Sequence, residues 1–192
     1  MIRRIAIVNR GEAAMRLIHA VRELNAQGGA QIETVALYTD GERSAMFVRE
    51  ADAAYALGPA ADRPYLDLAV LERALKQTGS DAAWVGWGFV AEDPNFAEMC
   101  DRIGVTFIGP SASAMRRLGD KIGSKLLAEE VGVTVAPWSR GAVDDLEAAL
   151  VSARPIGYTL MLTATAGGGG RGFLVVAPCD QRTACFAETR VE

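Results

Sequence analysis

Short apolar runs alternate with segments of helical periodicity along the first hundred residues. Residues 5–8 (IAIV) form a continuous apolar run of mainly β-branched residues, which predicts a buried strand. Residues 12–27 place apolar side chains three and four positions apart, and Gly28-Gly29 ends this helical pattern. Further strands are predicted at residues 34–38, 53–57, 82–85 and 105–108, and further helices at 43–50, 66–77 and 94–102. This order predicts an α/β fold with a doubly wound parallel sheet, whose ligands lie beyond the carboxyl ends of the strands.

The pattern changes after Pro110. Helices are predicted at residues 111–118, 121–130 and about 144–153, and one further helix is predicted at residues 180–192. Between them, two apolar strands at 160–166 and 173–176 enclose a run of glycines, which predicts a hairpin with a glycine tip. The residues after Pro110 are too few for a complete independent core, so we expect a second domain of which only the start is present.

Composition and charge exclude several classes of protein. The 192 residues are 50% hydrophobic and 23% charged with a net charge of −4, which is typical of a folded protein and disfavours general binding to nucleic acid or an anionic membrane. No apolar run approaches the ~20 residues that span a bilayer. Three cysteines without CxxC spacing and a single histidine, His19, make a zinc site or a disulfide framework improbable. We expect a cytoplasmic protein without a metal site of this kind.

The segment of greatest chemical interest is the glycine run in residues 163–172 (TATAGGGGRG). Gly167, Gly168, Gly169 and Gly170 lack Cβ atoms, so their backbone N–H groups can converge on one anion, with Arg171 as a neighbouring cation. This pattern favours a phosphate cradle over the alternative, a flexible hairpin tip. It is not a P-loop, because no G-x-x-x-x-G-K-[ST] is present and the glycines lead into a strand.

A second glycine motif follows the strand predicted at residues 82–85. Residues 86–91 (GWGFVA) match G-x-G-x-x-A, which leaves dinucleotide binding open as an alternative. However, Trp87 and Phe89 would crowd a pyrophosphate, and the first strand ends in Asn9-Arg10-Gly11 instead. Polar residues that are suitably placed for a site, or simply for capping and solvent contact, are Arg10, Glu12, Glu92 and Lys121.

Taken together, these segments resemble the biotin carboxylase component of biotin-dependent carboxylases. The resemblance is carried, in order, by IAIVNRGE at 5–12, Arg16 within 13–17, GWGFVAEDPNF at 86–96, FIGP at 107–110, GDK at 119–121 and GGGGRG at 167–172. It extends over the whole chain. The sequences of residues 84–92 and 133–139 are most similar to those of the large actinobacterial-type acyl-CoA carboxylases.

The resemblance implies a Rossmann-like domain at residues 1–113, followed at 114–192 by linker helices and the truncated start of an ATP-grasp domain. It implies that MgATP activates bicarbonate as carboxyphosphate and that CO₂ is placed on biotin. Lys121, Gly167 to Gly170 and Arg171 would then bind ATP. Residues Trp87, Gly88 and Glu92 would lie in a biotin-side cleft, and Arg16 at a homodimer interface. Implied partners are a biotin carboxyl carrier and a carboxyltransferase.

Two departures from the family pattern stand out. Thr163 occupies the position of a lysine that would contact a phosphate, and a hydroxyl cannot replace that cation. The family's metal-binding carboxylates, bicarbonate-positioning residues and base all correspond to positions beyond Glu192. We therefore expect no catalytic residue and no metal ligand among residues 1–192. We also expect weak or absent MgATP binding and no activity of this chain alone. The alternatives are a catalytically silent partner-binding pseudoenzyme and an NAD-binding oxidoreductase module.

Overall fold

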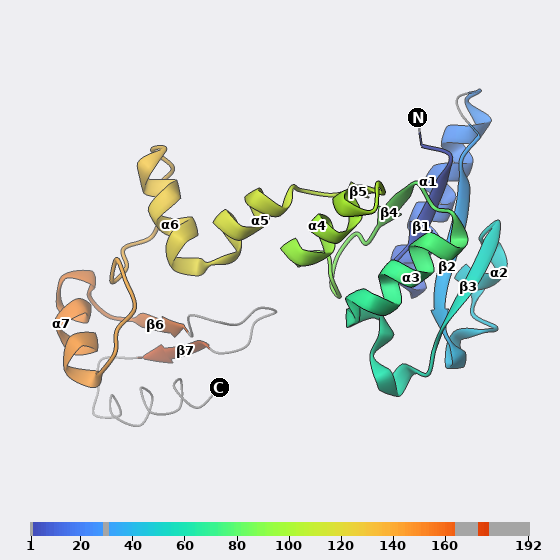
Figure 1. The fold of residues 1–192 in the computed structure, drawn as a ribbon. Coiled ribbons are helices and arrows are strands. Elements are labelled where there is room, and N and C mark those ends of the chain that lie inside the picture. Colours follow the sequence, from blue (N-terminus) through green and yellow to red (C-terminus); the bar gives the residue numbers. More distant parts are fainter. Residues whose placement is uncertain (1, 29–30, 164–172, 177–192) are drawn as a thin grey trace. The chain divides into compact units, whose positions relative to one another are not determined.

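The computed structural model describes residues 2–28, 31–163 and 173–176 (Figure 1). The chain divides into two compact units, Met1–Met115 and Arg116–Glu192, whose boundary falls within one helix. Each unit is described by itself below. Within the described ranges, no helix is long and apolar enough to cross a membrane.

A five-stranded parallel sheet forms the centre of the first unit. Its strands are β1 (Arg4–Ile7), β2 (Glu33–Thr39), β3 (Ala53–Gly58), β4 (Ala82–Trp84) and β5 (Thr106–Ile108), in the spatial order β3-β2-β1-β4-β5. The order reverses between β1 and β4, which are neighbours although they are far apart in sequence. The predicted doubly wound α/β class is confirmed, and its topological switch point lies between the carboxyl ends of β1 and β4.

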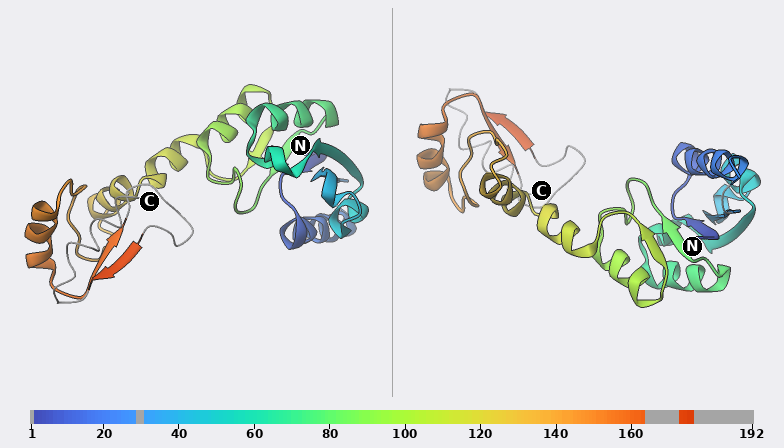
Figure 2. Two further views of the ribbon diagram at one scale, coloured as in Figure 1. Left: turned by 90° about the horizontal axis from the view of Figure 1, so that it is seen from below. Right: turned by 90° about the horizontal axis from the view of Figure 1, so that it is seen from above.

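Helices cover both faces of this sheet (Figure 2), where α1 and α3 lie on opposite sides of the strands. Along β1, Ile7 packs with α1 (Gly11–Ala26) and α2 (Met46–Glu50), while Ala6 and Val8 belong to the cluster formed with α3 (Leu68–Thr78) and α4 (Pro94–Arg102). Successive strand residues point to opposite faces, so both faces of β1 must be apolar. This is why the strand appears in the sequence as an unbroken apolar run.

Some predicted boundaries shift because side chains cap the backbone. The predicted helix at 43–50 begins only at Met46, since Thr39 and Glu42 form a capping box around the 3₁₀ turn η1 (Asp40–Glu42). Likewise, α3 begins at Leu68 because the Asp67 carboxylate accepts hydrogen bonds from two helix N–H groups, after the 3₁₀ turns η2 (Ala60–Asp62) and η3 (Pro64–Leu66). The helix predicted at 94–102 is confirmed.

The second unit begins within α5 (Ala112–Gly119), the helix that contains the boundary. It contains α6 (Lys121–Glu130), α7 (Leu146–Ile156) and the antiparallel hairpin β6 (Leu160–Thr163) and β7 (Phe173–Val176). The predicted hairpin is confirmed. The glycine tip at 167–172 and the helix predicted at 180–192 lie outside the described residues.

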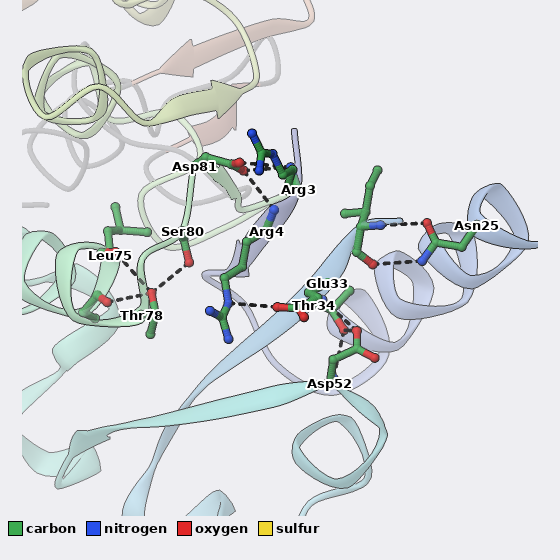
Figure 3. Close-up of polar contacts among 12 residues, drawn as sticks. Arg3, Arg4, Asn25, Glu33, Thr34, Asp52, Leu75, Thr78, Ser80 and Asp81 are labelled. Carbon is green, nitrogen blue, oxygen red and sulfur yellow. Dashed lines mark hydrogen bonds and ion pairs between the residues drawn. The ribbon is translucent and has the colours of Figure 1, made fainter. Parts of the chain in front are cut away.

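Hydrogen bonds to carboxylates connect the amino-terminal ends of neighbouring strands (Figure 3). The Asp81 carboxylate accepts hydrogen bonds of 2.9–3.1 Å from the backbone N–H groups of Arg3 and Arg4, which joins the segment before β4 to β1. The Asp52 carboxylate similarly accepts from the Thr34 N–H at 2.8 Å and hydroxyl at 2.7 Å. Backbone donors that precede the first ladder hydrogen bonds need partners, and these carboxylates supply them.

Candidate functional site

The switch point between β1 and β4 contains a buried amide. Asn9, two residues after the end of β1, is 5% exposed, and its Nδ2 donates to the carbonyl oxygens of Val85 at 2.7 Å and Trp87 at 2.9 Å. Its Oδ1 accepts from the Arg10 N–H at 2.8 Å, which sets the orientation of the amide. The loop after β1 therefore holds the loop after β4.

A cluster of charged and aromatic side chains lies at the same end of the sheet. The Arg10 guanidinium is 3.3 Å from Glu42 Oε1, and its Cζ lies 5.7 Å from the centre of the Phe89 ring. The Phe89 ring is stacked with that of Tyr65, with centres 4.7 Å apart. Residues from four separate segments thus meet around Phe89, which combines cation–π and aromatic contacts.

The ionisation of this cluster is settled by burial and hydrogen bonding. Burial, and then the charge of Glu42, raises the pKa of Tyr65, so its hydroxyl remains a donor to the Leu37 carbonyl at 2.6 Å. Burial acts to raise the pKa of Glu42 as well, but hydrogen bonds from the Thr39 N–H and hydroxyl, together with Arg10, lower it below its ordinary value. Glu42 is therefore an anion at neutral pH and pairs with the Arg10 guanidinium.

The loop held by Asn9 has an unusual backbone. Gly86, Gly88 and Phe89 have φ angles of +76°, +71° and +47°, the left-handed region that costs a non-glycine residue roughly 1–2 kcal/mol. A Cβ at Gly86 would lie 2.6 Å from the Trp84 ring, so glycine is also required for space. The Trp87 side chain is 54% exposed and meets Trp84 edge-on at 6.5 Å between ring centres. The indole of Trp87 is therefore presented at the surface and is not part of the buried core.

The remaining residues predicted on this unit are on its surface. Gly88 and Glu92 are exposed in the segment between β4 and α4, so Gly88 shares the loop with Trp87. Arg16 is exposed on α1 and forms an ion pair with Glu12 one helical turn earlier. His19 is exposed on the same helix, as its place outside the apolar stripe predicts. Arg16 is not part of the cluster around Phe89.

On the second unit, the candidate phosphate ligands are only partly described. Lys121 is the first residue of α6 and is half-buried, directly after Asp120, whose carboxylate accepts from the Gly123 N–H at 2.6 Å. A cation at a helix N-terminus fits a bound phosphate. Thr163 is exposed at the end of β6 and brings a hydroxyl instead of a cation. Residues 164–172, with Gly167 to Gly170 and Arg171, lie outside the described residues.

Sequence reasoning missed the residues that organise the switch point. Asn9 was considered only as part of an exit loop, while Glu42 and Tyr65 were not considered. A polar residue placed directly after a buried strand was the one available signal for Asn9. Within residues 2–28, 31–163 and 173–176, no group of His, Cys, Asp or Glu is arranged to hold a metal ion.

The fold and these segments define the class of protein: a doubly wound N-terminal domain followed by an ATP-binding domain. The family model "Biotin carboxylase, N-terminal domain" matches residues 1–115, and "Carbamoyl-phosphate synthase L chain, ATP binding domain" matches residues 120–192. The chain belongs to the biotin carboxylase family. The resemblance inferred from the sequence motifs is confirmed.

Relatives and solved structures agree with this assignment. Biotin carboxylase 1 of Bacillus subtilis is 42% identical over 91% of this chain, and the propionyl-CoA carboxylase alpha chain of Ruegeria pomeroyi is 38% identical over 91%. The chain spans 38% of the length of the first protein and 25% of the second. The crystal structure of a biotin carboxylase complex with βγ-ATP from Campylobacter jejuni matches 100% of this chain and 42% of its own, with 34% identity and a TM-score of 0.92.

A second solved structure was determined with a nucleotide, Mg²⁺ and bicarbonate. The biotin carboxylase domain dimer of the Hydrogenobacter thermophilus 2-oxoglutarate carboxylase was solved with MgADP, ADP and bicarbonate. It covers 98% of this chain and 40% of its own, at 36% identity and a TM-score of 0.88. Mg²⁺ and an adenine nucleotide are therefore ligands within this family.

Proposed function

We propose that this chain is the N-terminal part of a biotin carboxylase that uses MgATP and bicarbonate to carboxylate biotin. The observation that carries this proposal is the match to biotin carboxylases, which covers 91% of the chain in sequence and 100% of it in fold. In this reaction MgATP supplies the phosphoryl group that activates bicarbonate. By analogy with its multi-component relatives, the protein would act on biotin held by a carrier domain, and a carboxyltransferase would use the product in the cytoplasm.

For the nucleotide side, we assign phosphate contacts to Lys121, the glycine run Gly167 to Gly170, and Arg171. The half-buried position of Lys121 at the start of α6 supports this role, because the helix N-terminus and the ammonium group favour the same anion. Thr163 would weaken the site. Losing one charge-assisted contact costs roughly 1.5–3 kcal/mol, or about 10- to 150-fold in affinity.

For the acceptor side, we assign Trp87, Gly88 and Glu92 to the cleft that receives biotin. The exposure of Trp87 at the carboxyl ends of the parallel strands supports this, since that edge is where such folds bind ligands. Arg16, exposed on α1, is assigned to a contact between two copies of the chain. A dinucleotide site is less well supported, because α4 begins only at Pro94, well after the G-x-G-x-x-A motif.

These 192 residues by themselves are proposed to be inactive. They correspond to 38% of the length of the Bacillus subtilis relative. Phosphoryl transfer needs Mg²⁺ and positioned cations. A silent, partner-binding role is the second candidate function, and Thr163 at the lysine position is the observation that favours it.

Calorimetric titration of MgATP tests the nucleotide site. We expect weak binding by the chain and about 10- to 150-fold tighter binding by Thr163→Lys. Thr159→Lys is the matched control, because it adds the same charge four residues earlier, roughly 13 Å away along an extended chain. Equal affinity of the parent chain and Thr163→Lys would contradict the account of Thr163. Absence of binding by all variants would favour the partner-binding role.

A further inference from the structure

The loop Gly86–Phe89 depends on residues that are distant in sequence. The side-chain amide of Asn9 uses Nδ2 to hold two carbonyls of the segment after β4, 76 and 78 residues away. Its Oδ1 is engaged by the Arg10 N–H, so rotation of the amide would break all three contacts. This side chain is buried, which makes the contacts strong compared with those to solvent.

Arg10 fixes the other end of the same loop. Its guanidinium lies over the Phe89 ring, and its ion pair with Glu42 holds it there. The ring of Tyr65 stacks with that of Phe89, and the Tyr65 hydroxyl is itself held by the Leu37 carbonyl. Phe89 has a left-handed backbone and is held by these contacts. Trp87 is therefore restrained from two sides: Asn9 holds its backbone carbonyl, and Phe89 is fixed two residues later.

We propose that Asn9 and Arg10 are positioning residues that hold the Gly86–Phe89 loop so that Trp87 presents its indole to a flat, uncharged heterocycle. The proposal rests on the proposed function, in which that heterocycle is the ureido ring of biotin. A loop that is ordered before binding loses less conformational entropy when the ligand arrives. The indole supplies a rigid apolar surface with few rotatable bonds. Neither Asn9 nor Arg10 needs to touch the ligand for this role.

The order of the loop can be measured by ¹⁹F NMR of the full chain labelled with 5-fluorotryptophan, with Trp87→Phe used for assignment. Asn9→Asp replaces the Nδ2 donor with an acceptor that faces the Val85 and Trp87 carbonyls. We expect the Trp87 resonance to move toward the position of free fluorotryptophan, while that of Trp138 stays unchanged. A folded Asn9→Asp chain with an unaltered Trp87 resonance would overturn the proposal.

The chain offers a matched control and a second variant. Asn25 makes the same kind of contact, with its Nδ2 donating to the Ile32 carbonyl and its Oδ1 accepting from the Ile32 N–H. Asn25→Asp should leave the Trp87 resonance in place. If Asn9→Asp loses its far-ultraviolet circular dichroism, Arg10→Leu takes its place, because the Arg10 side chain is 57% exposed and its removal spares the core. An unchanged Trp87 resonance in Arg10→Leu would then overturn the proposal.

Titration with free d-biotin separates the positioning role from the proposed function. We expect biotin to shift the Trp87 resonance of the parent chain and of Asn25→Asp, and about threefold or more biotin to be required in Asn9→Asp. If biotin shifts no resonance in the parent chain while Asn9→Asp still alters Trp87, the loop contacts stand and the assignment of Trp87 to biotin fails. Equal biotin affinity in the parent chain and Asn9→Asp would overturn the link between the loop and binding.

Discussion

The two units of the chain differ in how they bury apolar side chains. In the first unit, fully buried side chains such as Ile7, Leu37 and Phe96 fill both faces of a five-stranded sheet. Among the described residues of the second unit, Ala153 and Val176 are the buried apolar residues. The facing pair Met161 and Val175 on the hairpin is 60% and 58% exposed.

Secondary structure can therefore form where little apolar core is present. The helices of the second unit have caps as good as those of the first, and its hairpin is in register. Capping satisfies local backbone groups, however, whereas most of the stability of a fold comes from apolar area removed from water. A two-stranded sheet has little such area of its own. We therefore expect the stability of the described chain to reside in the first unit.

The largest expected effect comes from a pair of truncations, one in each unit. Phe96 is fully buried against Phe107, with ring centres 5.5 Å apart, whereas Leu126 on α6 is 46% exposed. Phe96→Ala should lower the free energy of unfolding by about 3–5 kcal/mol. Leu126→Ala should change it by less than about 0.5 kcal/mol. Urea denaturation followed by circular dichroism measures both, and similar losses would refute the comparison.

A pair of helix caps gives an intermediate effect. Asp67 caps α3 in the first unit and Asp120 caps α6 in the second, and each carboxylate accepts from two backbone N–H groups. Each change to alanine should cost its helix roughly 0.5–2 kcal/mol. For Asp67→Ala the cost should appear in global unfolding, because α3 packs on the sheet. For Asp120→Ala it should appear as faster amide hydrogen exchange in α6 alone. A global loss from Asp120→Ala would show that the second unit unfolds together with the first.

The smallest expected effect is a pH dependence within the first unit. Hydrogen bonds from Arg102 on α4 and then from Lys76 lower the pKa of Glu72 on α3 from 4.5 to about 2. A carboxylate whose pKa is lowered by folding stabilises the protein above its unfolded pKa, and this contribution is lost as pH falls toward the folded pKa.

The advantage of the parent chain over Glu72→Gln should therefore be full above about pH 5 and shrink between 4.5 and about 2. Urea midpoints at several pH values measure it. Lys76 and Arg102 are exposed and Glu72 is half-buried, so we expect the advantage to be small and to fall further with added salt. A pH-independent difference between the two chains would mean that the Glu72 contacts are not electrostatic.

Much of the fold could be predicted where local signals agree. The unbroken apolar run at β1 predicted a strand buried on both faces, and Asp93 followed by Pro94 marks the start of α4. Boundaries were missed where a side chain caps a turn, as Glu42 does before α2, since several spacings of Thr and Glu are compatible with a cap. The ATP-side residues remain predictions, because residues 164–172 lie outside the described ranges.

Which segments become strands and helices follows from the amino-acid sequence alone, because periodicity, prolines and caps act over a few residues. The family also follows from the sequence, through motifs in a fixed order. The folded chain was needed to show that β1 lies beside β4, and hence that Asn9 meets the carbonyl of Trp87 and Arg10 lies over Phe89. Such contacts depend on which strands are neighbours and in what register, and the cost of bringing distant segments together is repaid by the whole core rather than by the residues that meet.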